Sequence, residues 1–333
     1  MRSLYFLVPG TGGKFACGGL WAELKTLHLA RQICAAEVVT YRQREPEVLF
    51  LDDLLRQPQR TDIIFVVSWG FDVPKLVRRL QGWPVLYHAH SAGYGFRLPA
   101  QIPIVAVSRN TMGYWGQQAP HSPIYYLPNQ ISDEFCDRSL QRDIDVLVQA
   151  RKSSGYLLQE LVPALRSQCR VELITSYVED LPGLFNRSKI YLYDSAEYWS
   201  QQRVSEGFGL PPMEALACGC QVFSSVNGAL ADYLDPGFTG HKIAVYSREY
   251  DLQRILQVLQ APPGPVSELF FAEYRTPQIL PRLQQILIEI NQFFDHQVQY
   301  PATIQELTRW RLAQLSTRRL WSKIRQRLWK PLS

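Results

Sequence analysis

Apolar and polar positions along the chain follow a pattern that predicts strands separated by helices. The first half has helix-like segments at 20–33 and 73–80. It also has short apolar runs, several of them with β-branched or aromatic residues, at 4–8, 36–40, 62–68, 84–88, 103–107 and 124–127. Strands that alternate with helices are typical of a parallel sheet in an α/β layer architecture.

The pattern stops at 130–142, which is polar and loop-like, and then starts again. The second half continues with strands at 144–148, 170–175, 189–193 and 221–225 and with helices at 154–166 and after Pro211. We therefore predict two α/β domains, residues 1–135 and 143–262, joined by a hinge near 130–142. Residues 263–300 are expected to form helices that cross back toward the first domain, and residues 301–333 a basic amphipathic helix.

Composition fits a globular protein of two domains. The chain has 333 residues, which at ~150 residues per domain predicts about two. Its apolar fraction of 46% is too high for a disordered chain. No run of apolar residues is long enough for a transmembrane helix, and the run at 4–8 is too short for a signal peptide. The six cysteines form no Cys-x-x-Cys pair, so we expect a cytoplasmic protein with reduced thiols.

Charge is concentrated at the C-terminal end of the chain. The formal net charge is +5, but residues 303–333 alone carry +7 and the remainder carries −2. A basic segment attached to a near-neutral body differs from a generally basic nucleic-acid binder, so no nucleic acid is expected as a partner.

The segment 204–222, VSEGFGLPPMEALACGCQV, has the features of an anion-binding loop that leads into a helix. Gly207 and Gly209 would let backbone N–H groups come close to a ligand. Pro211 or Pro212 suits the first helical turn, where no N–H is needed. A glycine-rich loop at a helix N-terminus binds phosphate through its amides and the helix dipole.

Two glutamates bracket this loop and carry a resemblance to a known family. Glu206 and Glu214 stand eight residues apart around the Gly-Phe-Gly-Leu-Pro core at 207–211. The segment resembles the signature of family 4 of the retaining glycosyltransferases. This family implies the GT-B fold, in which two Rossmann-like domains face each other across a cleft; here a C-terminal helical extension would follow them.

The resemblance also implies roles for single residues. Glu206 would hydrogen-bond the sugar of a nucleoside diphosphate sugar donor, and Glu214 would bind the ribose hydroxyls. The amides of Phe208, Gly209 and Leu210 would bind the donor's sugar and diphosphate. No cofactor is expected beyond this donor substrate, and no metal site.

The start of the second domain matches the family in one position and departs from it in another. The family has an Arg after the first strand of this domain and a Lys five residues later, and both neutralise the diphosphate. Arg151 fits the first position, but Tyr156 stands at the second. Lys152 is adjacent to Arg151 and could reach the same charge. A basic residue after a strand can also be a solvated loop charge.

The first domain has a glycine-rich turn between its first strand and first helix, PGTGGKFACGG at 9–19. Dinucleotide-binding folds use such a turn too, but Gly-x-Gly-x-x-Gly is missing and no acid ends the strand near residue 40. Gly18 and Gly19 match the paired glycines that the family places near the donor phosphate.

His88 and His90 lie at the end of the strand at 84–88, where side chains of an open α/β sheet point into the crevice. The family has a histidine here close to the reacting sugar, and we choose His90 because His88 lies within the strand. Two histidines at i and i+2 could begin a metal site, but the sequence indicates no third ligand. Asn129 matches the Asn of the family's Pro-Asn-Gly turn, with Gln130 in place of the Gly.

The basic tail has two open interpretations. Leu307, Trp310, Leu320, Trp321, Ile324 and Leu328 fall on or near one helical face, and Arg and Lys fill most of the rest. A basic amphipathic helix with tryptophans is typical of a membrane-surface element, which would place the protein peripherally on the cytoplasmic face of a membrane. The alternative is a C-terminal helix that packs back on the first domain. RNA binding is a third and weaker interpretation, because the body lacks a basic excess.

The leading hypothesis is a metal-independent retaining glycosyltransferase with Glu206, His90 and Arg151 as catalytic residues. It would move a sugar to a polysaccharide, lipid or other acceptor. Asp143 and Asp145 form the Asp-x-Asp triplet of metal-dependent transferases, but they stand at the start of the apolar run of their strand instead of at its end. A non-catalytic sugar-nucleotide-binding or scaffolding relative is the alternative. A sugar-nucleotide epimerase would need a pair of acid/base carboxylates in the first domain, which the sequence does not indicate.

Overall fold

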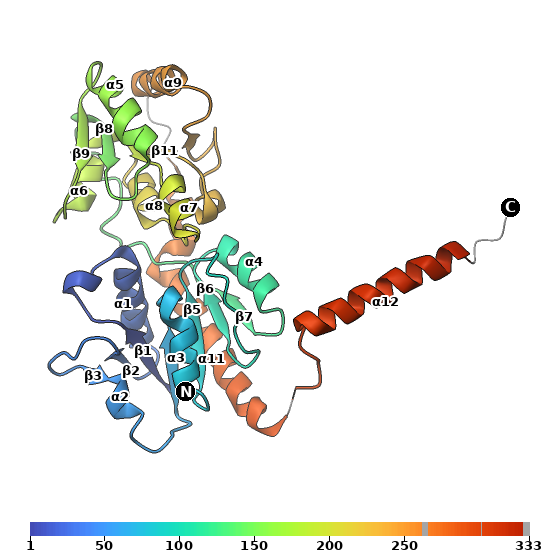
Figure 1. Cartoon of the computed structure of the whole chain (residues 1–333). Helices are drawn as coiled ribbons and strands as arrows, with labels where there is room; N and C mark the ends of the chain where they lie inside the picture. The colour runs from blue at the N-terminus through green and yellow to red at the C-terminus, as the bar shows by residue number, and fades with distance from the viewer. Residues whose placement is uncertain (262–265, 301, 329–333) are drawn as a thin grey trace.

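The computed structural model describes residues 1–261, 266–300 and 302–328, and it consists of two α/β domains, a long helix that joins the first domain and a separate C-terminal helix (Figure 1). Each domain is built on one sheet in which all paired strands run parallel. The architecture is therefore the GT-B arrangement of two Rossmann-like domains, with a helical C-terminal extension.

The first domain has a seven-stranded sheet of order β3-β2-β1-β4-β5-β6-β7. Its strands are β1 (Ser3–Val8), β2 (Ala36–Thr40), β3 (Leu49–Phe50), β4 (Ile63–Val67), β5 (Val85–Ala89), β6 (Ile104–Ala106) and β7 (Ile124–Tyr126). The helices between them are α1 (Gly18–Ala30), α2 (Leu51–Leu54), α3 (Val73–Arg79) and α4 (Arg109–Gln118), with short 3₁₀ turns at Gly13–Phe15 and Gly70–Asp72. All five residues of β4 and of β5 are buried, as expected for central strands with helices on both faces.

The second domain has a five-stranded sheet of order β12-β11-β10-β8-β9. Its strands are β8 (Ile144–Gln149), β9 (Val171–Ile174), β10 (Ser188–Tyr193), β11 (Gln221–Ser224) and β12 (His241–Lys242). Its helices are α5 (Val162–Arg166), α6 (Leu181–Asn186), α7 (Ala196–Gln202), α8 (Leu210–Ala217), α9 (Arg248–Gln260) and α10 (Glu268–Phe271). The helix predicted at 154–166 begins as a π-helical turn at Tyr156–Leu161, and 3₁₀ turns lie at Gly228–Asp232 and Ala272–Tyr274.

Helix α11 (Thr276–Gln299) belongs structurally to the first domain, although the second domain precedes it in sequence (Figure 1). Its apolar side packs on the first sheet and α1, where Leu283, Ile286, Leu287 and Ile290 share one core with Leu4, Phe6, Leu27 and Ile64. Polar contacts fix the same face, since Asn291 Oδ1 accepts the N–H of Arg2 at 2.8 Å.

The chain crosses between the domains twice, and one arginine joins the two crossings. Arg275, just before α11, is 9% exposed. Its guanidinium donates to the carbonyl oxygens of Ser132 and Phe135, each at 2.8 Å, in the polar stretch predicted as the hinge. Asn129 is buried at the start of this stretch, and Gln130 donates to Thr276 Oγ1 at 2.6 Å.

Helix α12 (Arg309–Leu328) projects away from both domains (Figure 1). Within the range 301–333 predicted as a basic amphipathic helix, the observed helix begins at Arg309, and residues 301 and 329–333 lie outside the described residues. None of the described helices is both long and apolar enough to cross a membrane.

Candidate functional site

The two domains meet where the loop after β5 contacts the glycine-rich loop before α8. Ser205 N donates to Ala92 O at 2.9 Å, and Ser91 Oγ donates to Ser205 O at 2.5 Å. A Cβ atom on Gly207 would lie 1.5 Å from the carbonyl oxygen of His90, so only glycine fits here. The sequence suggested a different use for Gly207, close approach to a ligand; in the structure its open side is filled by the first domain.

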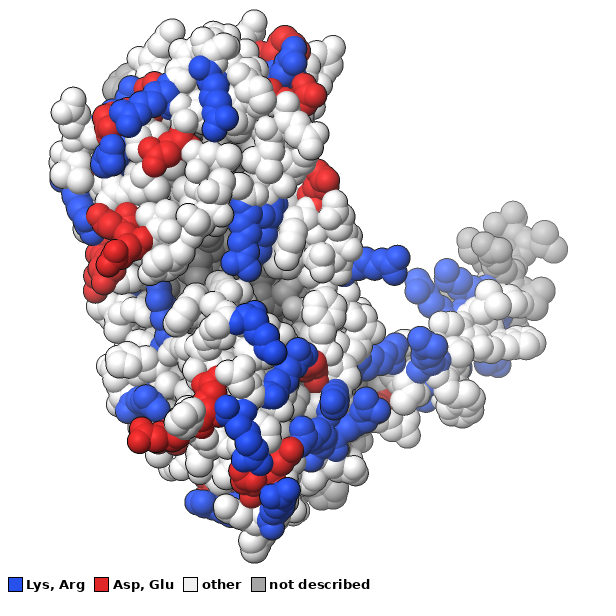
Figure 2. All heavy atoms as spheres, turned by 60° about the vertical axis from the view of Figure 1, so that its left-hand side comes forward, with Lys and Arg blue, Asp and Glu red and all other residues white. Residues whose placement is uncertain are grey.

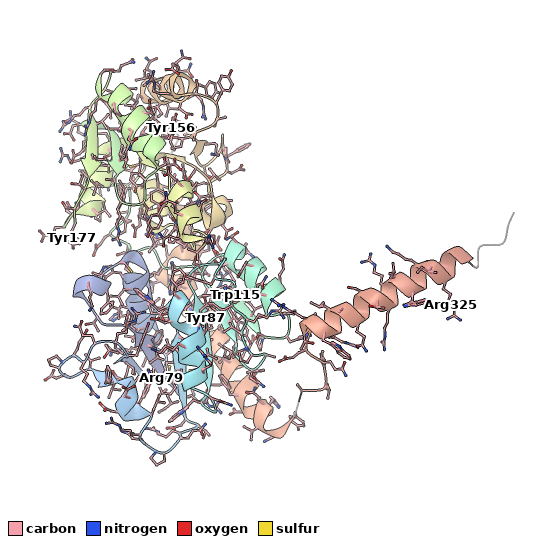
Figure 3. The ribbon with its side chains drawn as sticks, viewed as in Figure 1. Arg79, Tyr87, Trp115, Tyr156, Tyr177 and Arg325 are labelled. Atoms are coloured by element: carbon pink, nitrogen blue, oxygen red, sulfur yellow. The ribbon has the colours of Figure 1, made fainter. Side chains whose placement is uncertain are left out.

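Trp115 supports this contact from inside the first domain. Its indole N–H donates to Ser91 O at 3.2 Å, and its ring packs against Tyr87 with the ring centroids 5.0 Å apart (Figure 3). The loop that carries His90 is therefore anchored to the core. Figure 2 shows the surface hollowed along the boundary between the domains, with Lys and Arg side chains beside the hollow.

Glu206 is buried at this junction, with 5% exposure, and three side chains donate to one of its carboxylate oxygens. Tyr193 OH and Trp199 Nε1 reach Oε2 at 2.6 Å and Ser195 Oγ reaches it at 3.1 Å. Burial and the neighbouring Glu206 charge raise the pKa of Tyr193 well above its usual value, so Tyr193 stays a donor. These bonds hold the carboxylate in one orientation.

Gly209 immediately precedes α8, and there is no room for a side chain at this position. Its φ is +79°, and a Cβ would meet Leu230 Cδ2 at 2.2 Å. Pro211 and Pro212 follow and have no N–H. The amides of Phe208, Gly209 and Leu210 are therefore the loop donors that remain for an anion at the positive end of the helix dipole.

The ring of Phe208 is buried between Tyr233 and Tyr274, with centroids 5.9 and 5.7 Å away. Leu210, the first residue of α8, packs against the same core. Only their backbone is available for the role that the resemblance implied.

Glu214 lies on α8 and is 7% exposed. Burial raises the pKa of its carboxyl to about 7, and the positive charge of Lys25 partly opposes this shift. Lys25 belongs to α1 of the first domain, so the two domains interact electrostatically at this residue. Burial disfavours the charged form of Glu214, and a ligand that donates hydrogen bonds to the carboxylate would stabilise that form.

Arg151 and Lys152 follow β8, at the carboxyl edge of the second sheet. Arg151 is exposed. Lys152 has a φ of +69°, and its ammonium lies over the ring of Trp199, 4.3 Å from the centroid. Because Trp199 also donates to Glu206, Lys152 and Glu206 contact the same side chain.

Tyr156, which stands where the family has a lysine, points toward α9 (Figure 3). Its hydroxyl donates to Asp251 Oδ2 at 2.6 Å. Tyr156 is therefore committed to a contact within the second domain, and it supplies no positive charge. Of the two basic positions in the family, this chain has only the first.

Gly18 and Gly19 begin α1 on the opposite side of the boundary. Both are exposed, and no side chain caps the N-terminus of the helix. A Cβ on Gly18 would meet nothing within 4 Å. The amides of this first turn are thus open to an anion, but the glycines are not required by the fold itself.

His88 and His90 share a partner that the sequence prediction missed, Glu23 of α1. Glu23 Oε2 lies 2.5 Å from His88 Nδ1 and 2.8 Å from His90 Nε2, and the imidazole centroids are 4.3 Å apart. Burial alone would raise the pKa of Glu23, but the two histidines outweigh it and lower the pKa to about 2. Burial and His88 lower the pKa of His90, so a neutral His90 donates its Nε2–H to an ionised Glu23.

Glu23 corrects the expectation that no third ligand accompanies the two histidines. The ligand atoms of Glu23, His88 and His90 all lie within 4.8 Å of one another, a set that could hold a metal ion. Hydrogen bonds from both imidazoles already satisfy Glu23 Oε2. The sequence contained a pattern that could have indicated Glu23 as a partner of the histidines. Leu20, Glu23 and Leu27 share one side of α1, and an acidic residue among buried leucines needs a partner.

Asp143 and Asp145 lie at the opposite edge of the second sheet, where Asp143 precedes β8 and Asp145 is its second residue. Asp143 pairs with Arg170 at 2.9 Å and with Arg187 at 2.7 Å, and Asp145 pairs with Lys189 at 2.6 Å. Their carboxylates are part of surface ion pairs and lie at the end of β8 away from Arg151 and Lys152.

Comparison with known proteins agrees with this geometry. Residues 156–267 match the family model described as "Glycosyl transferases group 1". The matched range includes Glu206, the glycine-rich loop and Glu214. A comparison with curated proteins finds no match.

Solved structures share the fold at low sequence identity. A glycosyltransferase from Rickettsia africae ESF-5 superposes with a TM-score of 0.62 at 13% identity, covering 87% of this chain and 98% of the other. A sucrose-phosphate synthase from Thermosynechococcus elongatus gives 0.58 at 14% identity, covering 87% and 99%. Anabaena HepE, in complex with UDP and glucose, gives 0.52 at 14% identity, covering 90% and 100%. The family match and the GT-B fold together indicate a glycosyltransferase.

Proposed function

We propose that the protein is a retaining glycosyltransferase that uses a nucleoside diphosphate sugar and no metal ion. The observation that carries the proposal is the loop–helix segment 206–214 at the domain boundary. Along the sequence it has the fixed carboxylate of Glu206, the backbone amides of 208–210 and the buried carboxylate of Glu214. The backbone of His90, from the first domain, packs against Gly207 in this segment.

Each group has a role in this proposal. Glu206 accepts from the donor sugar, and the ribose hydroxyls donate to Glu214. Transfer breaks the bond between the anomeric carbon and the diphosphate oxygen, and the acceptor hydroxyl oxygen forms the new bond on the same face. The proton of the acceptor hydroxyl passes to the departing diphosphate oxygen. The diphosphate leaves with the electron pair, and Arg151, Lys152 and the amides of 208–210 stabilise its charge. Gly18 and Gly19 present further amides from the first domain.

The acceptor is a hydroxyl of a polysaccharide, a lipid or another molecule. We infer a cytoplasmic location, at the cytoplasmic face of a membrane if the acceptor is a lipid, because the six cysteines form no Cys-x-x-Cys pair and are too few for a disulfide scaffold. Metal independence is part of the proposal, and two observations support it: ion pairs occupy Asp143 and Asp145, and both imidazoles hydrogen-bond to Glu23 Oε2.

One observation favours a second candidate, a sugar-nucleotide-binding relative that does not catalyse transfer. Tyr156 replaces a lysine and bonds to Asp251, so the diphosphate has one cation fewer than in the family. Such a protein would bind the nucleotide and leave the glycosidic bond intact.

Nucleotide binding tests what both candidates share. Thermal unfolding of the full chain is measured with UDP, GDP and ADP and their common sugar conjugates. Saturation at ~100 times the dissociation constant stabilises a protein by about 2.7 kcal/mol, which is a shift of several degrees. We expect a shift with one nucleotide, lost in Glu214→Ala. No shift with any nucleotide would contradict the proposed site.

A further inference from the structure

Helix α12 is a long helix whose side chains are almost all exposed to solvent. Trp310, Leu320 and Trp321 are 75%, 60% and 66% exposed. In the part of the chain that the structure describes, α12 lies outside all four apolar cores, and α11 occupies the face of the first sheet (Figure 1). The alternative raised by the sequence, a tail packed on the first domain, is not the arrangement observed.

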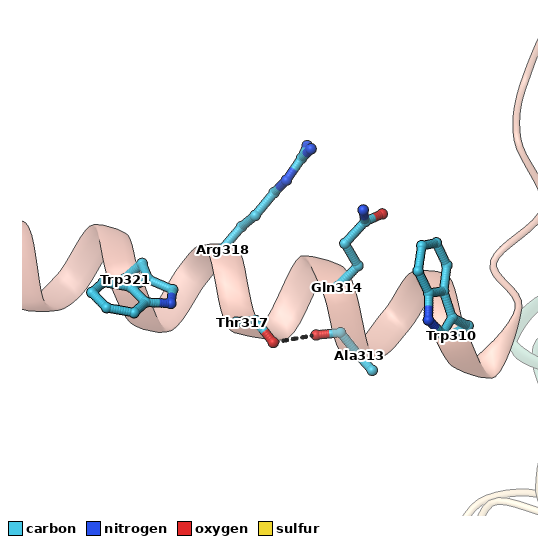
Figure 4. A pocket seen from close by; sticks show the side chains of 6 residues that line it. All are labelled: Trp310, Ala313, Gln314, Thr317, Arg318 and Trp321. Atoms are coloured by element: carbon cyan, nitrogen blue, oxygen red, sulfur yellow. Dashed lines mark hydrogen bonds between the residues drawn. The ribbon is translucent and has the colours of Figure 1, made fainter.

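One side of α12 is apolar over three turns. Trp310, Ala313, Thr317 and Trp321 follow at spacings of three and four residues and line a shallow hollow with Gln314 and Arg318 (Figure 4). Thr317 Oγ1 donates to Ala313 O at 2.9 Å, so its hydroxyl is internally satisfied and its methyl group remains on this side. Ile324 continues the same side, whereas Leu312 and Leu315 lie on the other side near the start of the helix.

Basic residues flank this apolar side. Arg311, Arg318 and Arg325 are spaced seven residues apart and form one stripe beside it. Lys323 and Arg309 lie on the other flank. The range 309–328 contains seven Lys and Arg residues and no Asp or Glu. Figure 2 shows these basic side chains along the projecting helix.

Charge decides which partner fits such a helix. A second copy of α12 would bring two strongly cationic helices together without any acidic partner, and like charges would oppose the contact. RNA would match the charge, but it would leave two tryptophans and an isoleucine arranged as a continuous apolar side without a role. An anionic lipid surface matches both features, because it takes apolar side chains below the headgroups and attracts flanking cations.

We propose that α12 lies in the interface of an anionic membrane, parallel to its surface. Trp310 and Trp321 enter the boundary between headgroups and acyl chains, and the long Arg and Lys side chains reach the lipid phosphates beside them. Residues 302–308 connect this helix to α11, so docking leaves the two domains free to bind ligands. This claim does not depend on the proposed transferase activity.

The test is flotation of the full-length protein with vesicles of phosphatidylcholine alone or mixed with phosphatidylglycerol. We expect binding to the mixed vesicles that weakens as salt is raised, and little binding to the neutral ones. Each of the substitutions Trp310→Ser and Trp321→Ser should weaken vesicle binding at least tenfold, and the two losses in binding free energy should add in the double variant. Arg311→Gln, Arg318→Gln and Arg325→Gln combined should bind roughly 100-fold more weakly.

A matched control separates local docking from net charge. Arg56→Gln, Arg78→Gln and Arg166→Gln remove the same charge from exposed positions on the body and should leave vesicle binding within about twofold. Because α12 is detached from the cores, the variants on α12 should keep the parent melting temperature. Three results would overturn the proposal: no binding to anionic vesicles, equal losses in the control, or a tryptophan-dependent dimer or RNA complex that forms in place of vesicle binding.

Discussion

At the scale of single residues, Glu206 and Glu214 differ in how their carboxylates are stabilised. Three donors hold Glu206, so its orientation is set before any ligand arrives. Glu214 is buried and its pKa is raised to about 7, with only the charge of Lys25 opposing the shift. A ligand that donates hydrogen bonds to Glu214 would favour its ionised form.

Glu214 should therefore couple nucleotide binding to proton release. Near pH 6.5 the nucleotide converts a partly protonated carboxyl to a carboxylate, so affinity should rise as pH increases toward about 7. Calorimetric titration in two buffers of different ionisation enthalpy measures the protons released. We expect a net release that is absent in Glu214→Gln; equal heats in both buffers would contradict this role.

The same carboxyl predicts how stability depends on pH. Its folded pKa lies above the unfolded value of 4.5, so the folded state binds the proton more tightly between these values. This group should lower the free energy of unfolding by roughly 3 kcal/mol as pH rises from about 4.5 to 7. Urea unfolding of the parent and Glu214→Gln at both pH values measures the difference, which should be smaller in the variant.

Gly207 is where the second domain touches the backbone of the first. Gly207→Ala puts a methyl group 1.5 Å from His90 O, so the two loops must separate. We expect nucleotide-sugar binding at least tenfold weaker in this variant. Gly116→Ala on α4, where a Cβ meets nothing within 4 Å, is the matched control and should bind like the parent. Unchanged binding by Gly207→Ala would mean that the domain contact is not part of the site.

The cluster of Glu23, His88 and His90 could act as a hydrogen-bonded arrangement or as a metal centre, and removal of metal ions tests which of the two it is. If the carboxylate serves only to fix His90, EDTA dialysis should leave nucleotide binding, melting temperature and donor turnover unchanged. Elemental analysis before and after dialysis provides the check. A stoichiometric ion whose removal lowers the melting temperature would contradict metal independence.

At the scale of secondary-structure elements, α11 is the piece that makes the first domain complete. Its apolar residues close the core formed by β1, β4 and α1, although residues 127–275, which include the hinge and the second domain, separate it from β7. The two chain crossings are tied by Arg275, so α11 also fixes the hinge.

Truncation of α11's packing side should destabilise the first domain specifically. Leu287→Ala, at 1% exposure, removes buried methyl groups from the shared core and should cost about 2–5 kcal/mol. Gln284→Ala on the exposed side is the control and should be near neutral. Denaturant unfolding measures both; a loss below 0.5 kcal/mol for Leu287→Ala would contradict the packing described.

The elements that the sequence could predict are those with strong local patterns. The buried runs at 4–8, 144–148 and 189–193 became β1, β8 and β10, because central parallel strands are continuously apolar. The strands β3 and β12 have two residues each and leave no periodic signal. The Glu23–His90 contact joins positions 67 residues apart, and no local rule specifies such a pair.

At the scale of the whole molecule, two GT-B domains contact each other at the glycine-rich loop while α12 stands apart. The site positions that the resemblance named lie on the loop after β5, the start of α1, the turn after β8, the loop before α8 and α8 itself. The resemblance did not name Lys25 and Trp199. Lys25 acts on Glu214 and Trp199 donates to Glu206 only because of how α1 and α7 are oriented in the fold. The arrangement brings the groups that we propose bind the nucleotide, in the second domain, together with His90 and α1 of the first.

The central claim is that the protein transfers a sugar with retention of configuration at the site between its two domains. Cleavage of the donor tests this claim most directly. The full-length protein is incubated with the nucleotide sugar that the binding panel selects, and NMR follows the anomeric proton of the released sugar before mutarotation. We predict slow release of the nucleoside diphosphate and of a sugar with the donor's own anomeric configuration, reduced roughly 100-fold or more in Glu206→Gln. Binding without any cleavage would favour the non-catalytic relative, and release of the opposite anomer would contradict a retaining mechanism.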